Sequence, residues 1–197
     1  MSDFISLLLS SLIQLIIFSI IPFILWLITG KKTNFFQWIG LKKPIFNGSG
    51  LKIFAIIVVV VGSYIGTMYF IMATLLRDVP TATNQFSNKG LIAVPSILVY
   101  AIIQTSLSEE LFFRGFLCKR LANQFGFITG NVIQSILFGL LHGIPFGLAT
   151  GNWFVFILLT ILPAIIGYVQ GWLNEKKANG SIIPSWILHA QNVNFAE

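Results

Sequence analysis

Charge is scarce in this sequence. Only 9% of the 197 residues are Asp, Glu, Lys or Arg, and hydrophobic residues make up 56%, whereas an ordinary soluble domain carries about 25% charged residues. The mean hydropathy is +0.88. A soluble chain of this length cannot bury so much apolar surface in one core. A bilayer accommodates it because lipid surrounds the outer faces of the helices. These values exclude most classes of soluble protein.

Cysteine is also scarce. The single cysteine, Cys118, excludes an intrachain disulfide framework, and we interpret it as a small packing residue. The chain begins Met1-Ser2-Asp3, without the basic segment of a secretory signal. The apolar run that follows is too long for the hydrophobic part of such a signal. We therefore expect this run to be retained as a membrane span.

Six apolar segments predict membrane-spanning helices, because a span needs about 20 mostly apolar residues. Their approximate bounds are residues 4–29, 52–76, 91–121, 129–148, 153–173 and 182–197. The third segment continues through three adjacent polar residues, Ser108, Glu109 and Glu110. The sequence predicts an all-α fold: one membrane-embedded domain, residues 1–197, built as a polytopic transmembrane helix bundle of about six spans.

The basic residues predict the orientation in the membrane, because cytoplasmic loops are enriched in Lys and Arg. If the helices alternate in direction, nine of the twelve basic residues fall on one side: Lys31, Lys32, Lys42, Lys43, Lys52, Lys119, Arg120, Lys176 and Lys177. The other side has Arg77 and Lys89. We expect a multi-pass protein of the cell membrane with its N-terminus outside and its lysine-rich loops in the cytoplasm. Because the charges are spread over short loops, we expect no nucleic-acid partner.

Three charged residues lie close together inside the third span: Glu109, Glu110 and Arg114. A charge within a membrane helix costs roughly 2.5–3.5 kcal/mol on insertion scales, so such residues are retained where they pair or line a cavity. On a helix, Glu110 and Arg114 are one turn apart and can form a salt bridge. Glu109 lies about 100° away around the helix and is left without this partner.

Two more spans carry a histidine. His142 follows an apolar run in the fourth span, with Phe138 one turn before it. His189 lies in the sixth span, with Asn192 and Asn194 shortly after it. Three separate apolar segments thus bring an ionisable group to a similar depth. Since ionisable residues inside a membrane mark functional sites, the pattern favours one site built from all three segments.

These residues resemble three motifs of the CPBP intramembrane endopeptidases, the CAAX protease and bacteriocin-processing family, which is also called the Abi family. Residues 109–114 (EELFFR) match its EExxxR motif, residues 138–142 (FGLLH) match its FxxxH motif, and His189 resembles the histidine of its third motif. The order and approximate spacing agree over about residues 91–195, which we interpret as a family-like catalytic core. The first two spans resemble the family in hydropathy alone.

The third motif departs from the family pattern. The family usually places Asn or Asp four residues after the histidine, and that position here is Val193. Asn192 and Asn194 flank it. We expect one of these two asparagines to serve the site instead.

The resemblance implies hydrolysis of a peptide bond by a glutamate-activated water. It makes Glu109 the general base, with His142 holding the water. It makes His189 and Asn192 the donors that stabilise the oxyanion. Amide hydrolysis requires both functions, a base for the water and donors for the developing negative charge. The supporting residues that it implies are Glu110, Arg114, Phe138 and Asn194.

Zinc chemistry is the alternative mechanism. Glu109, His142 and His189 are of the residue types that ligate a catalytic zinc. The HExxH helix motif of many zinc proteases is absent. We expect no cofactor, and zinc held by these three residues is the alternative.

The predicted function is that of an intramembrane endopeptidase. Its partners would be membrane lipid and a membrane-associated peptide or protein, such as a CAAX-type tail, a bacteriocin precursor or a leader peptide. Its role would be processing or bacteriocin self-immunity. A second hypothesis is a non-catalytic bacteriocin-immunity protein that acts by binding, and a third is a small transporter or channel subunit, which no pair of half-repeats supports. The sequence leaves the substrate and the oligomeric state open.

Overall fold

The computed structural model describes residues 2–29, 32–77 and 79–193, and within these ranges the chain is helical and has no β-strand. Five helical stretches are long and apolar enough to cross a membrane: Asp3–Thr29, Gly50–Thr74, Gly90–Phe125, Phe127–Thr150 and Trp153–Lys177. They correspond to the first five predicted segments, and the sixth begins as helix α8, Ile183–Val193. The predicted all-α, multi-pass membrane fold is confirmed.

The first two spans and the short helix between them are α1 (Ser2–Thr29), α2 (Phe35–Ile39) and α3 (Gly50–Thr74). Asn34 caps α2, because its side-chain oxygen accepts a hydrogen bond from the backbone N–H of Gln37 at 2.8 Å. Gly40 ends this helix with a φ of 88°, a left-handed conformation that favours glycine. Two short 3₁₀ turns, η1 (Ala82–Phe86) and η2 (Gly90–Ala93), lead from α3 into the third span.

The third span departs from the regular α-helix that the sequence predicts. It consists of α4 (Val94–Val99), the π-helical segments η3 (Tyr100–Leu107) and η4 (Glu110–Cys118), and α5 (Lys119–Phe125). The hydroxyls of Ser106 and Ser108 donate to the carbonyls of Ala101 and Ile103, five residues earlier. Such bonds help to satisfy carbonyls that lipid cannot. π-helical turns are rare and often lie at functional sites, and here the second begins at Glu110.

The fourth and fifth spans, α6 (Phe127–Thr150) and α7 (Trp153–Trp172), form a closely packed antiparallel hairpin. Glycines let the two backbones approach. A Cβ on Gly139 would collide with the carbonyl oxygen of Thr160, and one on Gly143 would collide with the Thr160 hydroxyl. Small residues at a crossing give close helix packing in membranes. The hairpin is therefore a rigid wall for whatever packs against it.

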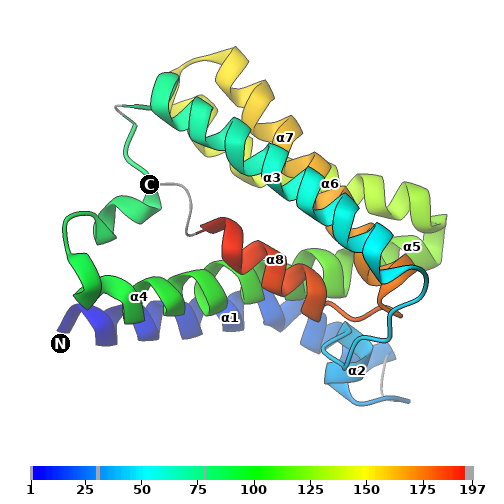
Figure 1. Ribbon diagram of the computed structural model, residues 1–197. Helices are drawn as coiled ribbons and strands as arrows, with labels where there is room; N and C mark the ends of the chain where they lie inside the picture. The colour runs from blue at the N-terminus through cyan, green and yellow to red at the C-terminus, as the bar shows by residue number, and fades with distance from the viewer. Residues whose placement is uncertain (1, 30–31, 78, 194–197) are drawn as a thin grey trace.

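Figure 1 shows the helices in two groups, with α1 beside the third span in one and α3, α6 and α7 in the other. The groups lie close together near α5 and diverge toward the end where α1 begins (Figure 1). The π-helical segment η5 (Leu173–Lys177) extends α7 and leads to α8. Helix α8 lies in the space between the two groups and packs against η3.

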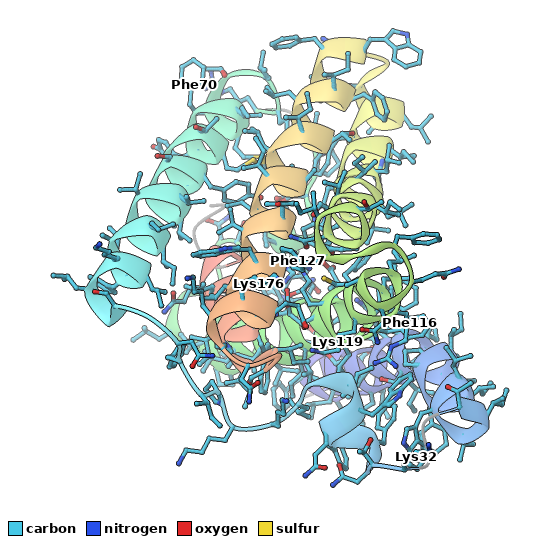
Figure 2. The ribbon with its side chains drawn as sticks, turned by 90° about the vertical axis from the view of Figure 1, so that its right-hand side faces the viewer. Lys32, Phe70, Phe116, Lys119, Phe127 and Lys176 are labelled. Atoms are coloured by element: carbon cyan, nitrogen blue, oxygen red, sulfur yellow. The ribbon has the colours of Figure 1, made fainter. Side chains whose placement is uncertain are left out.

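The lysine-rich loops come together at one end of the molecule. Lys119 forms an ion pair with Glu175 and donates a hydrogen bond to the carbonyl of Gly180 at 2.7 Å. This end faces the viewer in Figure 2, which labels Lys32, Lys119 and Lys176 there. Three groups of basic residues that the sequence predicts on one side of the membrane thus share one end of the fold. The side on which that end lies stays a prediction.

Candidate active site

The site contains a buried ion pair. Glu110 and Arg114 are both 0% exposed and lie one turn apart on η4, with Arg114 Nη1 3.0 Å from Glu110 Oε1. Arg114 Nη2 donates a hydrogen bond to Gln170 Oε1 on α7. The guanidinium carbon lies 3.9 Å from the centre of the Phe138 ring on α6. A carboxylate, an amide and an aromatic face thus compensate the buried cation, which would otherwise be costly.

Glu110 also holds helix α8. The Ser185 hydroxyl donates to Glu110 Oε2, and His189 Nδ1 lies 3.1 Å from Glu110 Oε1. Ser185 and His189 are four residues apart and therefore share one face of α8. The indole N–H of Trp186 donates to the Ile102 carbonyl of η3 at 2.8 Å. Polar contacts therefore dock α8 on the third span.

Glu109 lies toward the two histidines. Its Oε2 atom is 3.7 Å from His189 Nε2 and 4.0 Å from His142 Nε2, and it is buried without a hydrogen-bond partner. Direct hydrogen bonds between such atoms need about 2.7–3.2 Å, so these gaps leave place for a bridging molecule. The structure brings together three side chains that the sequence puts on three separate segments.

The partners of the two Nδ1 atoms determine where the imidazole protons lie. His142 Nδ1 is 2.9 Å from the Phe138 carbonyl, which can only accept, so Nδ1 carries the hydrogen. His189 Nδ1 faces the Glu110 carboxylate, which also accepts. A neutral imidazole protonated at Nδ1 has a lone pair at Nε2. Each histidine in its neutral form therefore presents Nε2 as an acceptor on the side of Glu109.

Phe138 packs against both histidines of the site. Its ring centroid lies 4.5 Å from that of His142, 5.8 Å from that of His189 and 5.2 Å from that of Phe113. The side chain is 3% exposed. One buried ring thus contacts both histidines and, on its face, the Arg114 guanidinium. Its position suits the supporting role that the sequence predicts.

Three buried polar residues that no motif marks also belong to this region: Gln170, Asn174 and Ser185. Gln170 contacts Arg114, and Asn174 Nδ2 donates to the Ser185 hydroxyl at 2.6 Å. Spacing is the signal that could have found them. Gln170 and Asn174 are four residues apart at the end of an apolar segment, and Ser185 lies one turn before His189.

The predicted asparagines cannot be placed beside these residues. Asn192 belongs to α8 by its backbone, but its side chain and all of Asn194 lie outside the described residues. That one of them serves the site therefore stays a prediction.

The distances also bear on the zinc alternative. Ligand atoms of a tetrahedral zinc with bonds of about 2.0–2.1 Å lie about 3.3 Å apart. The separations of Glu109 Oε2 from the two histidines, 3.7 and 4.0 Å, are wider. In the described part of the chain, no three His, Cys, Asp or Glu side chains form a group that could hold a metal ion. The residues as arranged here do not fit a zinc site.

Apolar helices that cross a membrane, with a glutamate facing two histidines between them, point to the class of intramembrane endopeptidases. The family model described as "Type II CAAX prenyl endopeptidase Rce1-like" matches residues 91–194, about half of the chain. The chain belongs to this Rce1-like family, which confirms the resemblance to the CPBP endopeptidases and points to an intramembrane endopeptidase of the CAAX type. Neither the search of curated proteins nor the search of solved structures gives a match.

Proposed function

We propose that this protein hydrolyses a peptide bond of a membrane-associated peptide or protein, using a water molecule that Glu109 activates. One observation carries the proposal. The buried Glu109 Oε2 has no hydrogen-bond partner and faces Nε2 of both histidines across 3.7 and 4.0 Å. A water about 2.8 Å from each atom can bridge such a gap. These distances support a water molecule within hydrogen-bond reach of both the Glu109 carboxylate and an imidazole.

The chemistry follows from the atoms that are free to react. Glu109 takes a proton from the water, and the resulting hydroxide attacks the carbonyl carbon of the peptide bond. His142 Nε2, an acceptor when the ring is neutral, holds the water through its second hydrogen. As the oxyanion collapses to a carboxylic acid and the C–N bond breaks, Glu109 passes its proton to the leaving amine nitrogen, so the reaction consumes water alone. No co-reactant is needed.

The oxyanion requires a donor. Because His189 Nδ1 is engaged by Glu110, its Nε2 can donate only when the ring carries a second proton. Nε2 then donates to the oxyanion. The side-chain amide of Asn192 or Asn194 would supply a second donor. Arg114 and Phe138 support this arrangement by neutralising and packing Glu110 and the imidazoles.

The substrate would be a peptide held at the membrane. The family is described as prenyl endopeptidases of CAAX sequences, so a prenylated CAAX-type tail is one candidate. A bacteriocin precursor or leader peptide is the other, and the role in the cell would then be self-immunity. Both share a scissile bond kept near lipid by an apolar anchor, which a site between membrane helices can reach.

The decisive experiment uses the full-length protein purified in detergent and reconstituted in vesicles. It is given a panel of quenched peptides: a farnesylated CAAX peptide, the same peptide without the prenyl group, and apolar leader peptides. Glu109→Gln keeps the shape but cannot accept a proton, so cleavage should fall by a factor of about 10²–10⁴. Glu175→Gln is the matched control, because Glu175 pairs with Lys119 away from the site. Retained cleavage in Glu109→Gln would refute the mechanism.

The same preparation tests the asparagines and the metal. Asn192→Ala and Asn194→Ala should differ in rate, and the more damaging change identifies the residue that replaces the family's usual position. Titration with a chelator should leave activity intact, and elemental analysis should find no stoichiometric zinc. Stoichiometric zinc that is lost together with activity would replace the glutamate mechanism with a zinc mechanism. Binding of a bacteriocin without cleavage of any peptide would favour the non-catalytic immunity protein.

A further inference from the structure

Ser185 has a position that the proposed reaction has not yet used. It lies one turn before His189 on α8 and is 0% exposed. Its hydroxyl oxygen lies within hydrogen-bond distance of three groups: Glu110 Oε2, the Ile182 carbonyl at 3.0 Å and Asn174 Nδ2 at 2.6 Å. The amide of Asn174 can only donate at Nδ2, so the hydroxyl accepts from it.

The single hydroxyl hydrogen must then go to one of two acceptors. A carboxylate is a stronger acceptor than a backbone carbonyl, because hydrogen bonds to charged groups are shorter and about twice as strong. The hydrogen therefore goes to Glu110 Oε2. Asn174 thus favours one orientation of the Ser185 hydroxyl, and the hydroxyl in turn fixes one oxygen of Glu110.

Fixing Oε2 determines where the other oxygen points. Glu110 Oε1 is 3.0 Å from Arg114 Nη1 and 3.1 Å from His189 Nδ1. If the carboxylate could rotate about its last bond, Oε1 would no longer be the oxygen that faces both Arg114 and His189. Held by Ser185, the carboxylate keeps the proton of His189 on Nδ1 and aims Nε2 at Glu109, 3.7 Å away. Partners behind a reacting imidazole set its tautomer and orientation in many sites.

We propose that Ser185 and Asn174 are positioning residues, which act through Glu110 to orient His189 for the reaction. The inference rests on the proposed function for its kinetic consequence, but its structural part concerns His189 alone. It also links the segment after the fifth span to the site, because Asn174 belongs to η5. That segment also carries Lys176 and Lys177, and it leads to α8.

The kinetic test compares Ser185→Ala with Ser181→Ala in the peptide-cleavage assay. Removing a hydrogen bond to a charged group should lower kcat about 10- to 100-fold, while KM changes by no more than about twofold. Ser185→Thr keeps the hydroxyl and should restore most of the rate. Ser181 is the matched control: it is also a buried serine, just before α8, but its hydroxyl donates to the Lys42 carbonyl. Ser181→Ala should lower thermal stability and leave kcat of the folded protein within about twofold.

Asn174→Ala should lower kcat less than Ser185→Ala, and the double variant should match Ser185→Ala, because Asn174 acts through the serine. Additive losses would contradict that chain. Equal kcat in Ser185→Ala and wild type would overturn the proposal.

A spectroscopic readout separates this proposal from the proposed function. The chain has two histidines, so ¹⁵N-histidine NMR of the intact protein, with His142→Gln for assignment, resolves both rings. In the absence of substrate, we expect the neutral His189 ring to be protonated at Nδ1 in the wild type and to be a mixture of tautomers in Ser185→Ala, with His142 unchanged. This result without any peptide cleavage would refute the protease and sustain the positioning role. Cleavage by the wild type with His189 signals unaffected by Ser185→Ala would do the reverse.

Discussion

Helices α3 and α7 are alike in hydropathy and unlike in surroundings. Their most apolar windows have mean hydropathies of 2.2 and 2.1, yet 6% of the α3 window is buried within the protein, against 39% of the α7 window. A Cβ on Gly62 or Gly66 of α3 would meet nothing within 4 Å. Gln170 of α7, by contrast, is buried against Arg114. Two helices with nearly the same hydropathy thus differ in how much of their surface packs against the rest of the protein.

The difference shows what hydropathy measures. It reports that a segment prefers lipid or a protein interior to water, and both α3 and α7 satisfy this condition. Hydropathy does not report whether the segment is surrounded by lipid or by protein. Helix α3 packs through its last turn and the residues just after it, where Ile71 and Leu76 meet Val155 and Leu159 of α7. Most of its remaining surface is left to lipid, whereas α7 forms one wall of the site.

The largest effect is expected from the buried cation that α7 helps to hold. Arg114→Ala leaves Glu110 buried without its partner, which should lower the free energy of unfolding by about 3–5 kcal/mol. Equilibrium unfolding in mixed micelles measures it. Replacing Glu110 and Arg114 together by leucines should recover much of the stability without activity. An unchanged unfolding midpoint in Arg114→Ala would show that loss of the ion pair does not destabilise the fold.

The next effect is catalytic. His189→Ala removes the proposed oxyanion donor and should lower kcat by a factor of about 10²–10³ in protein that still folds. The matched change on the lipid side is Phe54→Ala on α3, where the side chain is 64% exposed, and it should leave kcat unchanged. Peptide cleavage in reconstituted vesicles measures both. A loss in Phe54→Ala as large as that in His189→Ala would remove the distinction between the two faces.

Glycine substitutions give a smaller and more direct comparison of the two environments. Gly139→Ala puts a methyl group against the Thr160 carbonyl and should destabilise the protein by about 1–3 kcal/mol through overpacking. Gly62→Ala meets open space and should be neutral or stabilising by up to about 1 kcal/mol, because alanine is the better helix former. Thermal unfolding in one detergent compares them. Equal shifts would mean that α3 is covered by protein in the working assembly.

The smallest effect concerns orientation and should leave stability and activity unchanged. Cysteines are introduced at Asn47 and Asn84, exposed residues before and after α3, in a Cys118→Ser background. With the lysine-rich end in the cytoplasm, an impermeant thiol reagent should label position 84 in whole cells and position 47 only after lysis. The opposite pattern would reverse the predicted orientation.

Hydropathy and local spacing were enough to predict the spans and the Glu110–Arg114 pair. Both are properties of a single segment: an apolar run prefers lipid wherever its neighbours lie, and residues four apart on a helix meet without help from the rest of the chain. The motifs added Glu109, His142 and His189, and the family match over residues 91–194 agrees with that resemblance.

Other features of the site depended on contacts between distant residues, which local periodicity cannot express. The third span contains two π-helical segments, which its apolar run did not predict. The hydrogen bonds of Glu110 to Ser185 and His189 join residues 75 and 79 positions apart. They decide which nitrogen of His189 faces Glu109. A serine or an asparagine in an apolar segment has no fixed partner until the helices pack, because a hydrogen bond forms only within about 3 Å. The crossing of α8 over the third span therefore determines which polar residues belong to the site.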